Sequence, residues 1–247
     1  TIKFLHEREA YQTVPVTADM AASHIPYRIF SFFPTQVIAE LQDRYRVELI
    51  SHHNRASLSR ELLDDNINTW FRTDGMFNHE PLTEKQTAYL FVRALNGSST
   101  STLSLSVNVA RFSSTTTAQE LGTSNVKYVL SPLELGNPWK LVFQSSAVNG
   151  KIPVYIYENP FFKTRWYLHQ TDSDTVNGIT LERYSAGELR LKTTTTGTHE
   201  LIFSETGAPY WQATIDGTPT DITRANIAYQ SIMVPTGTHE IVFIYPG

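Results

Sequence analysis

The sequence predicts an α+β protein in which a mixed α/β region, residues 1–168, precedes an antiparallel, jelly-roll-like β-sandwich, residues 169–247. Three observations favour this fold class. Helical stripes occur only in the first half of the chain. After Gln170, glycine turns recur about every 8 to 12 residues, which is typical of a sandwich. Aromatic residues make up 12% of the 247 residues and threonine occurs 30 times, and both residue types favour strands.

Composition excludes several classes of protein. The chain has no cysteine, which excludes disulfides, thiol nucleophiles and cysteine-bound zinc. A net charge of −4 gives no electrostatic reason to expect a nucleic-acid partner. No apolar run reaches the roughly 18 residues of a membrane span. The sequence opens at Thr1 and its first methionine is Met20, so we expect a segment of a longer protein.

The first half mixes strands and helices. The aromatic run at residues 27–33 predicts a buried strand, and residues 35–48 carry the i, i+3, i+4 stripe of an amphipathic helix. Two further helices are expected at 57–70 and 83–95, followed by an alternating strand at 103–109. A single helical turn at 118–122 then leads into four strands, which we expect at 126–130, 140–144, 154–157 and 165–168.

In the second half the sequence predicts strands and no helix. The polar residues 170–174 form the expected linker. Asp216-Gly217 predicts a hairpin turn between a strand at 211–215 and a short strand near 220–222. The remaining strands are expected at 179–184, 188–192, 199–203, 227–234 and 239–245.

A short repeat lies within this half. The sequence TGTHELIF at 196–203 returns as TGTHEIVF at 236–243. Its period of 40 would suit a propeller blade, but two copies cannot make a propeller. We expect two similar strands of one sandwich, each entered by a glycine turn.

The residues from Ser204 onward resemble the C-terminal extracytoplasmic module of the YfhO-like bacterial membrane proteins. That family has a strand ending in Ser-Glu, a Trp-x-Ala-x-Val-Asp-Gly strand, an Arg-Ala-Asn-like segment and a Val-Pro-x-Gly-x-His turn before a final strand ending in Tyr. The residues that match here are Ser204, Glu205, Trp211, Ala213, Asp216, Gly217, Arg224, Ala225, Asn226, Val234, Pro235, Gly237, His239 and Tyr245. Tyr210 stands where the family usually has glycine.

The resemblance extends upstream in the same order. Tyr27-Arg28-Ile29 resembles an early strand of the family, and Asp74-Gly75 with Glu80-Pro81-Leu82 resembles its Asp-Gly-Tyr-x-Pro-Leu segment. The run NVKYVL at 125–130 and the run VYIYENP at 154–160, followed by Arg165, also match family strands. The resemblance implies a module outside the cytoplasmic membrane, attached to transmembrane helices of a class C glycosyltransferase-like protein. It also implies that the catalytic acid lies in an early loop of the parent chain, outside this segment.

Residue types suited to metal binding and to acid–base chemistry occur at several places in the chain. His52-His53 and Asp64-Asp65 offer metal-ligand types, but adjacent side chains diverge on a strand or helix, so no metal site is predicted. Glycoside hydrolysis needs two carboxylates about 5 to 10 Å apart, for which Glu158, Glu205, Asp216 and Asp221 are available. We expect Glu158 to cap a turn, and the Asp-Gly turn explains Asp216. No nucleophile elbow or P-loop occurs.

Aromatic side chains give the best candidate site. Sugars stack their apolar faces on aromatic rings while nearby polar groups fix their orientation. The predicted carbohydrate-binding residues are Tyr210, Trp211, Arg224, Asn226 and Tyr229. The competing interpretation, which we favour for the first two, is that Trp211 packs in the sandwich core and Tyr210 lies over its edge.

Three functions remain open. The leading one is the extracytoplasmic portion of a membrane-embedded glycosyltransferase-like protein, which supports or binds cell-envelope glycan and lacks the catalytic centre. Its partners would be transmembrane helices of the parent chain and a glycan or lipid-linked sugar. The second is an independent carbohydrate-binding module, and the third is a glycoside hydrolase. No catalytic residue, metal or cofactor is predicted within this segment.

Overall fold

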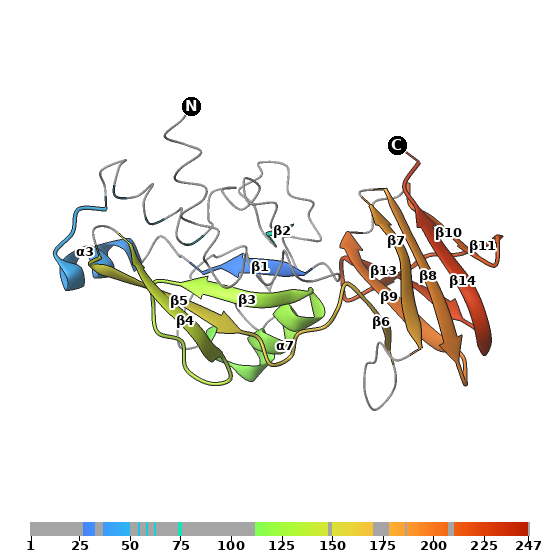
Figure 1. Cartoon of the computed structure of the whole chain (residues 1–247), viewed down its shortest axis with the longest axis horizontal. Coiled ribbons are helices and arrows are strands. Elements are labelled where there is room, and N and C mark those ends of the chain that lie inside the picture. Colours follow the sequence, from blue (N-terminus) through green and yellow to red (C-terminus); the bar gives the residue numbers. More distant parts are fainter. Residues whose placement is uncertain are drawn as a thin grey trace. The chain divides into compact units, whose positions relative to one another are not determined.

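Strands are the main secondary structure of the described residues (Figure 1). The computed structural model describes residues 27–32, 37–49, 54, 58, 62, 74–75, 112–147, 150–169, 178–185, 187–206 and 210–246. These residues divide into two units, the first ending at Phe162 and the second beginning at Lys163. Most of the described structure is β-sheet, in agreement with the β-rich fold that the sequence predicts.

The first unit is built on one five-stranded sheet of order β2-β1-β3-β5-β4. Strand β1 runs parallel to β2 and β3, and the other pairs are antiparallel. The strands are β1 (Arg28–Ser31), β2 (Asp74–Gly75), β3 (Val126–Ser131), β4 (Lys140–Ala147) and β5 (Ile152–Glu158), and the helices are α3 (Val37–Tyr45) and α7 (Thr115–Thr123).

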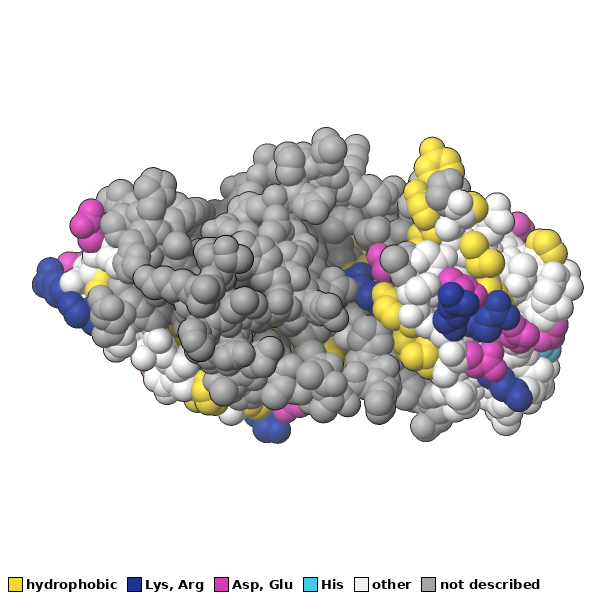
Figure 2. All heavy atoms as spheres, turned by 45° about the horizontal axis from the view of Figure 1, so that its top comes forward, with side chains coloured by type: hydrophobic (Ala, Val, Ile, Leu, Met, Phe, Trp, Pro, Cys, Tyr) yellow, Lys and Arg dark blue, Asp and Glu magenta, His cyan; other side chains and the backbone are white. Residues whose placement is uncertain are grey.

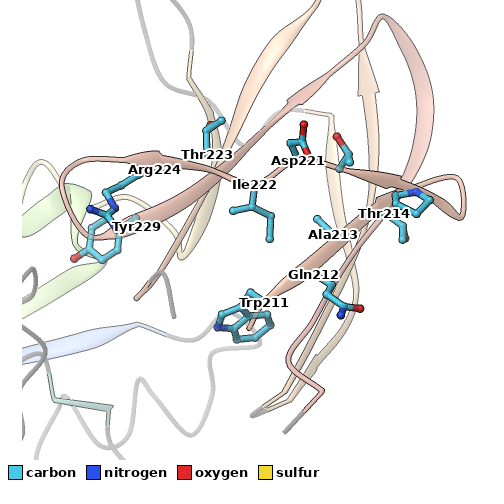
Figure 3. Close-up of a pocket in the computed structure, with 11 residues that line it drawn as sticks. Trp211, Gln212, Ala213, Thr214, Asp221, Ile222, Thr223, Arg224 and Tyr229 are labelled. Carbon is cyan, nitrogen blue, oxygen red and sulfur yellow. The ribbon is translucent and has the colours of Figure 1, made fainter. Parts of the chain in front are cut away.

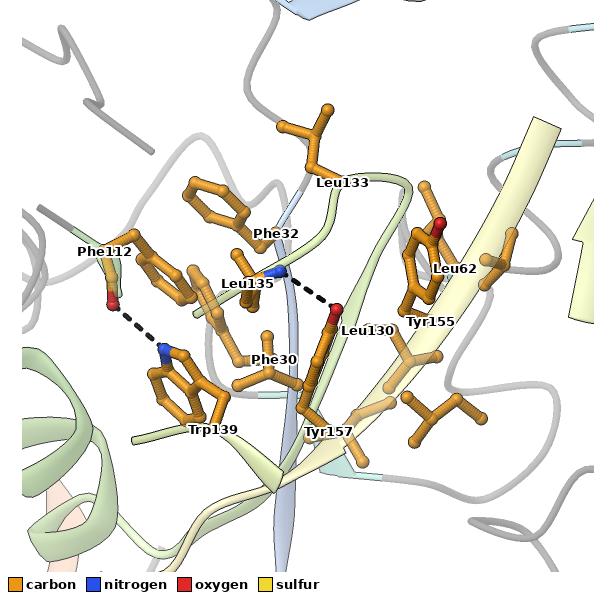
Figure 4. Packing of buried hydrophobic residues seen from close by; sticks show 14 of the residues in the cluster. Phe30, Phe32, Leu62, Phe112, Leu130, Leu133, Leu135, Trp139, Tyr155 and Tyr157 are labelled. Atoms are coloured by element: carbon orange, nitrogen blue, oxygen red, sulfur yellow. Dashed lines mark hydrogen bonds between the residues drawn. The ribbon is translucent and has the colours of Figure 1, made fainter. Parts of the chain in front are cut away.

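Aromatic stacking fills the core of this unit (Figure 4). The Phe112 ring stacks on Phe32 with centroids 3.8 Å apart and on Trp139 at 5.4 Å. The indole N–H of Trp139 donates to the Phe112 carbonyl at 3.0 Å. The Tyr157 hydroxyl accepts from the backbone N–H of Leu135 at 2.9 Å. The buried polar atoms of these rings thus have the partners that burial requires.

The second unit has two antiparallel sheets, of order β11-β10-β14-β8-β7 and β12-β13-β9-β6. Apolar side chains from both sheets, such as Leu191, Phe203, Ile232 and Phe243, join in one buried cluster. The strands are β6 (Trp166–His169), β7 (Ile179–Ser185), β8 (Glu188–Thr195), β9 (His199–Thr206), β10 (Gln212–Ile215), β11 (Thr218–Thr220), β12 (Thr223–Ala225), β13 (Tyr229–Val234) and β14 (Gly237–Ile244).

The strands expected in the second half are confirmed, with two differences. Strand β11 begins at Thr218, two residues before the expected place, and β12 was not predicted. The strand at the end of the first predicted region is β6, which pairs with β9 of the second unit. The units divide before this strand, whereas the sequence predicted a boundary after it.

The repeated segment forms β9 and β14, which lie in different sheets. In both copies the histidine ring returns to the glycine two residues earlier. A Cβ on Gly197 would lie 3.6 Å from His199 Nε2, and one on Gly237 would lie 3.1 Å from His239 Nε2. The two copies differ at the glycine itself, because Gly237 has a positive φ of 125° and already belongs to β14, whereas β9 begins only at His199.

Among the described residues of the first half, one helix and the strands are confirmed and one element is corrected. The expected helix at 35–48 is α3 and the strand at 126–130 is β3. The single turn expected at 118–122 is too short, because Ser114 caps α7 by accepting from the N–H of Thr117 at 3.2 Å. Of the helix expected at 57–70, only Leu58 and Leu62 are described, and both are buried. The helix expected at 83–95 and the strand at 103–109 lie outside the described residues.

Candidate functional site

A groove of about 450 Å³ opens on the second unit (Figure 3). Its walls come from β10, β11, the residues that connect β11 to β12, and the β12–β13 hairpin. The described residues that line it are Trp211, Gln212, Ala213, Thr214, Pro219, Thr220, Asp221, Ile222, Thr223, Arg224 and Tyr229. Apolar and polar side chains thus share one open site.

The β10–β11 hairpin forms one wall of the groove, and the backbone conformation of its turn determines its shape. Asp216 and Gly217 both have positive φ, 51° and 77°, as a two-residue type I′ turn requires. Ile215 pairs with Thr218 across this turn, so the predicted Asp-Gly turn is confirmed. Pro219 has no N–H to donate, which suits the edge position of β11.

Trp211 lies where the core meets the groove. Its ring meets the buried Phe203 edge to face, with centroids 5.6 Å apart at 89°. Trp211 packs against the core, as expected, but it is only partly buried and lines the groove. One part of the Trp211 side chain therefore contacts the core, and another part is exposed to the groove.

The structure brings three of the five predicted site residues to the groove, namely Trp211, Arg224 and Tyr229. Tyr229 is only 3% exposed, whereas Arg224 is exposed. Asn226 is not among the described lining residues, and its Nδ2 donates to the hydroxyl of Tyr167 at 2.9 Å. Tyr210 is not among them either. It is 64% exposed, and its ring lies edge-on to Tyr245 at 6.4 Å.

The β12–β13 corner beside the groove carries backbone strain. Asn226 and Ile227 have φ values of 45° and 74°, a region that a β-branched residue rarely adopts. The N–H of Ala228 donates to the Asn226 carbonyl at 2.9 Å, which closes a strained γ-turn around Ile227. Strained turns cluster at binding sites. No sequence signal marks this feature, because isoleucine is unexpected there.

Most of the acidic side chains considered for hydrolysis form ion pairs with basic residues outside the groove lining. Glu158 pairs with Lys140 at 2.9 Å, Glu205 with Arg165 at 3.6 Å, and Asp216 with His239 at 2.7 Å. Asp221 is the one acidic side chain among the described lining residues. A single carboxylate does not meet the two-acid requirement of glycoside hydrolysis.

Metal ligands do not gather in the part of the chain that the structure describes. No group of three His, Cys, Asp or Glu residues that could hold a metal ion occurs among those residues. The His52-His53 and Asp64-Asp65 pairs lie outside the described residues.

Asp216 and His239 form a clamp on the β10–β11 hairpin, which sequence reasoning missed. Asp216 Oδ2 lies 2.7 Å from His239 Nδ1, and Asp216 Oδ1 accepts from the Glu240 N–H at 2.8 Å. The bond from His239, followed by that from Glu240, lowers the pKa of Asp216. The bond to Asp216, followed by that to the Thr236 carbonyl, raises the pKa of His239.

These opposite shifts predict a stability that depends on pH. The histidine contribution is complete below its ordinary pKa and is lost as pH rises through the raised value, whereas the aspartate contribution is lost as pH falls through the lowered value. We expect His239→Gln to lower the urea midpoint most between about pH 4 and 6.5, which are the ordinary pKa values of aspartate and histidine. At alkaline pH the variant and the unmodified chain should have nearly the same urea midpoint.

His199→Gln provides the matched control for this measurement. His199 stands at the same place in its repeat, and no ion pair joins it to a described residue. It therefore reports the effect of losing a histidine without a clamp. A His239→Gln difference that stays constant across the pH series would show that the clamp does not stabilise the hairpin.

Comparison with protein-family models, curated proteins and solved structures found no match for the chain. No helix formed by the described residues is long and apolar enough to cross a membrane.

Proposed function

We propose that this chain is the extracytoplasmic, non-catalytic portion of a membrane-embedded glycosyltransferase-like protein, and that its second unit binds cell-envelope glycan in the groove. The observation that carries the proposal is the position of Trp211. Its ring rests on the core and lines a groove whose other walls offer hydroxyl, amide, carboxylate and guanidinium groups.

A sugar is the ligand class that these groups suit best. The apolar face of a pyranose packs on an aromatic ring, and its hydroxyls take hydrogen bonds around the edge. Trp211 and Ile222 supply the apolar surface, while Thr223 and Gln212 supply donors and acceptors. In Figure 3 the Ile222 side chain points toward Trp211, and Arg224 and Tyr229 lie at one end.

The finer fold that we infer for this unit is a jelly-roll-like sandwich. Its two sheets contribute to one core. Strand β14 pairs with β8 and β10 and not with its chain neighbour β13, so the chain passes repeatedly between the sheets. Such crossing connections are typical of Greek-key and jelly-roll topologies.

Localisation and partners follow from the resemblance to the YfhO-like proteins. Transmembrane helices of the parent chain would anchor the segment at the extracytoplasmic face. An independent carbohydrate-binding module would use the same groove, so the flanking sequence of the parent gene distinguishes the two. Hydrophobic spans beside this segment support the membrane-attached form, and their absence supports the independent module.

Trp211→Phe tests the binding site. We expect it to weaken binding of soluble envelope polysaccharide at least about tenfold, or ~1.4 kcal/mol, because phenylalanine keeps the contact with Phe203 but offers a smaller ring. The measurement is affinity electrophoresis followed by isothermal titration.

Met233→Ala is the control, because Met233 is an exposed apolar side chain of the same unit and is not among the described lining residues. Equal binding by Trp211→Phe and the unmodified chain, with unchanged circular dichroism, would contradict the proposed site.

A further inference from the structure

Three aromatic rings follow one another at the edge of the groove. The Trp211 and Tyr245 ring centroids are 5.6 Å apart, and those of Tyr245 and Tyr210 are 6.4 Å apart. Tyr210 is 64% exposed and Tyr245 is 37% exposed. We call these three residues the aromatic row. Figure 2 shows hydrophobic side chains standing at the surface of this unit.

The sheet holds two residues of the row, Trp211 and Tyr245, in place. Strands β10 and β14 pair with Gln212 opposite Ile244, so Trp211 and Tyr245 extend the same end of two neighbouring strands. The Tyr245 N–H donates to the Gly187 carbonyl at 2.8 Å, which fixes its backbone beyond the last paired residue. Binding groups on such supports are better positioned than groups on free loops.

Successive rings of the row are turned against one another. The planes of Trp211 and Tyr245 make an angle of 56°, and those of Tyr245 and Tyr210 make an angle of 78°. A crystalline polysaccharide presents a flat surface, which can lie against coplanar rings only. A soluble chain can turn between consecutive sugars, so it can place a sugar on Trp211 and another on the tyrosines.

Charged groups in the groove are available to a ligand. Arg224 and Asp221 line the groove, and no ion pair joins either of them to a described residue. By contrast, Arg183 and Arg190 on the face of the neighbouring strands are paired with Glu188 and Glu240. A glycan chain that extends from Trp211 along the groove can therefore form hydrogen bonds with Arg224 and Asp221.

We propose that Tyr210 and Tyr245 form a second sugar subsite, so that the groove and the aromatic row together bind a soluble, turning glycan chain and not a flat crystalline surface. This inference rests on the proposed glycan-binding function and names its substrate class. A glycan fits better than a lipid surface because the row continues into a groove with polar walls.

The experiment compares chain lengths. Isothermal titration uses disaccharide, tetrasaccharide and hexasaccharide series of β-1,3-glucan and of maltose-type α-glucan, and sedimentation uses crystalline cellulose. In the series that binds, we expect affinity to rise about tenfold from the disaccharide to the hexasaccharide. Tyr210→Ala should remove this gain, whereas Met233→Ala should keep it and leave disaccharide affinity unchanged within about twofold. Tyr210→Phe should keep it, and crystalline cellulose should not retain the protein.

The outcomes separate the two proposals. A gain with chain length that survives both Tyr210→Ala and Tyr245→Ala would overturn the second subsite while Trp211 dependence still supported the groove. Retention on crystalline cellulose or on anionic phospholipid vesicles, lost in Tyr210→Ala, would also overturn it. Absence of binding to every soluble glycan would overturn both proposals. Because Tyr210 is largely exposed, its variants keep the fold, which circular dichroism checks, and Met233→Ala remains the control.

Discussion

Gly122→Ala is expected to destabilise the first unit by at least about 2 kcal/mol, even though alanine favours a helix interior over glycine by about 1 kcal/mol. Gly122 is buried in α7. A Cβ at this position would lie 2.1 Å from the carbonyl oxygen of Phe161 and 2.7 Å from its carbon. Both atoms are backbone, so no side-chain rotation relieves the clash.

The Phe161 carbonyl cannot easily retreat, because its turn is fixed on both sides. The Phe161 N–H donates to Asn159 Oδ1 at 3.0 Å, and the Phe162 N–H donates to the Asn159 carbonyl at 3.2 Å. The helix and the turn are therefore pressed together with room for a hydrogen only. Overpacking at such contacts costs about 1–3 kcal/mol and sometimes more, which outweighs the gain in helix propensity.

Gly136→Ala is the matched control for this measurement. A Cβ there would lie 3.8 Å from the Cβ of Ser113, an ordinary contact, so we expect a change within about 0.5 kcal/mol. The midpoint of urea unfolding, followed by tryptophan fluorescence, compares the two variants. Equal midpoints would show that the turn at Phe161 yields at little cost and that its approach to α7 does not limit the sequence.

The strands of the second unit could be predicted because local patterns dominate there. In β8, buried Leu189, Leu191 and Thr193 alternate with more exposed neighbours, and Gly178 supplies the positive φ before β7. Strand β12 could not be predicted. Its three residues, Thr223–Ala225, have no alternation of their own and become a strand only through pairing with β13.

The candidate site was only partly predictable, because register brings its members together. Asp216 was predicted as a turn residue, but its contact with His239 depends on the pairing of Ile215 with Ile241. The recurrence of His two residues after Gly was the available signal, yet among the described residues only the histidine of the second copy pairs with an aspartate. Composition cannot show which predicted aromatic lies in the groove and which lies beside it, since both Trp211 and Tyr210 precede the same strand.

Two sequence runs of the first unit, NVKYVL at 125–130 and VYIYENP at 154–160, meet around one buried amide. Asn159, from the VYIYENP run, is 2% exposed. Its Nδ2 donates to the carbonyl of Ala118 in α7 at 2.9 Å and to that of Val126 in β3 at 3.2 Å, and its N–H donates to the Lys127 carbonyl at 2.8 Å. The NVKYVL run supplies Val126 and Lys127. A structural role thus accounts for this asparagine without catalysis.

Asn159→Ala should therefore lower the free energy of unfolding by about 2–4 kcal/mol, because it removes the side-chain partner of two buried carbonyls and of one partly buried N–H. Urea unfolding measures the loss. Glycan binding by the second unit should not change at temperatures where the variant is folded. An unchanged unfolding midpoint would show that Asn159 does not hold α7, β3 and the turn together.

Asn159→Asp sharpens the test, because it keeps the size of the side chain but replaces the donating amide with an oxygen facing two carbonyls. Burial and carbonyl repulsion should raise the pKa of this introduced carboxyl group above its ordinary value of about 3.9. The folded state then binds the proton more tightly than the unfolded state, so stability falls as pH rises between the two values. We expect the variant to approach the stability of the unmodified chain most closely in acid and to fall furthest below it near pH 8. A deficit that does not grow with pH would mean that the introduced carboxylate oxygens find donors, and that the amide of Asn159 is not required as a double donor between the helix and the strand.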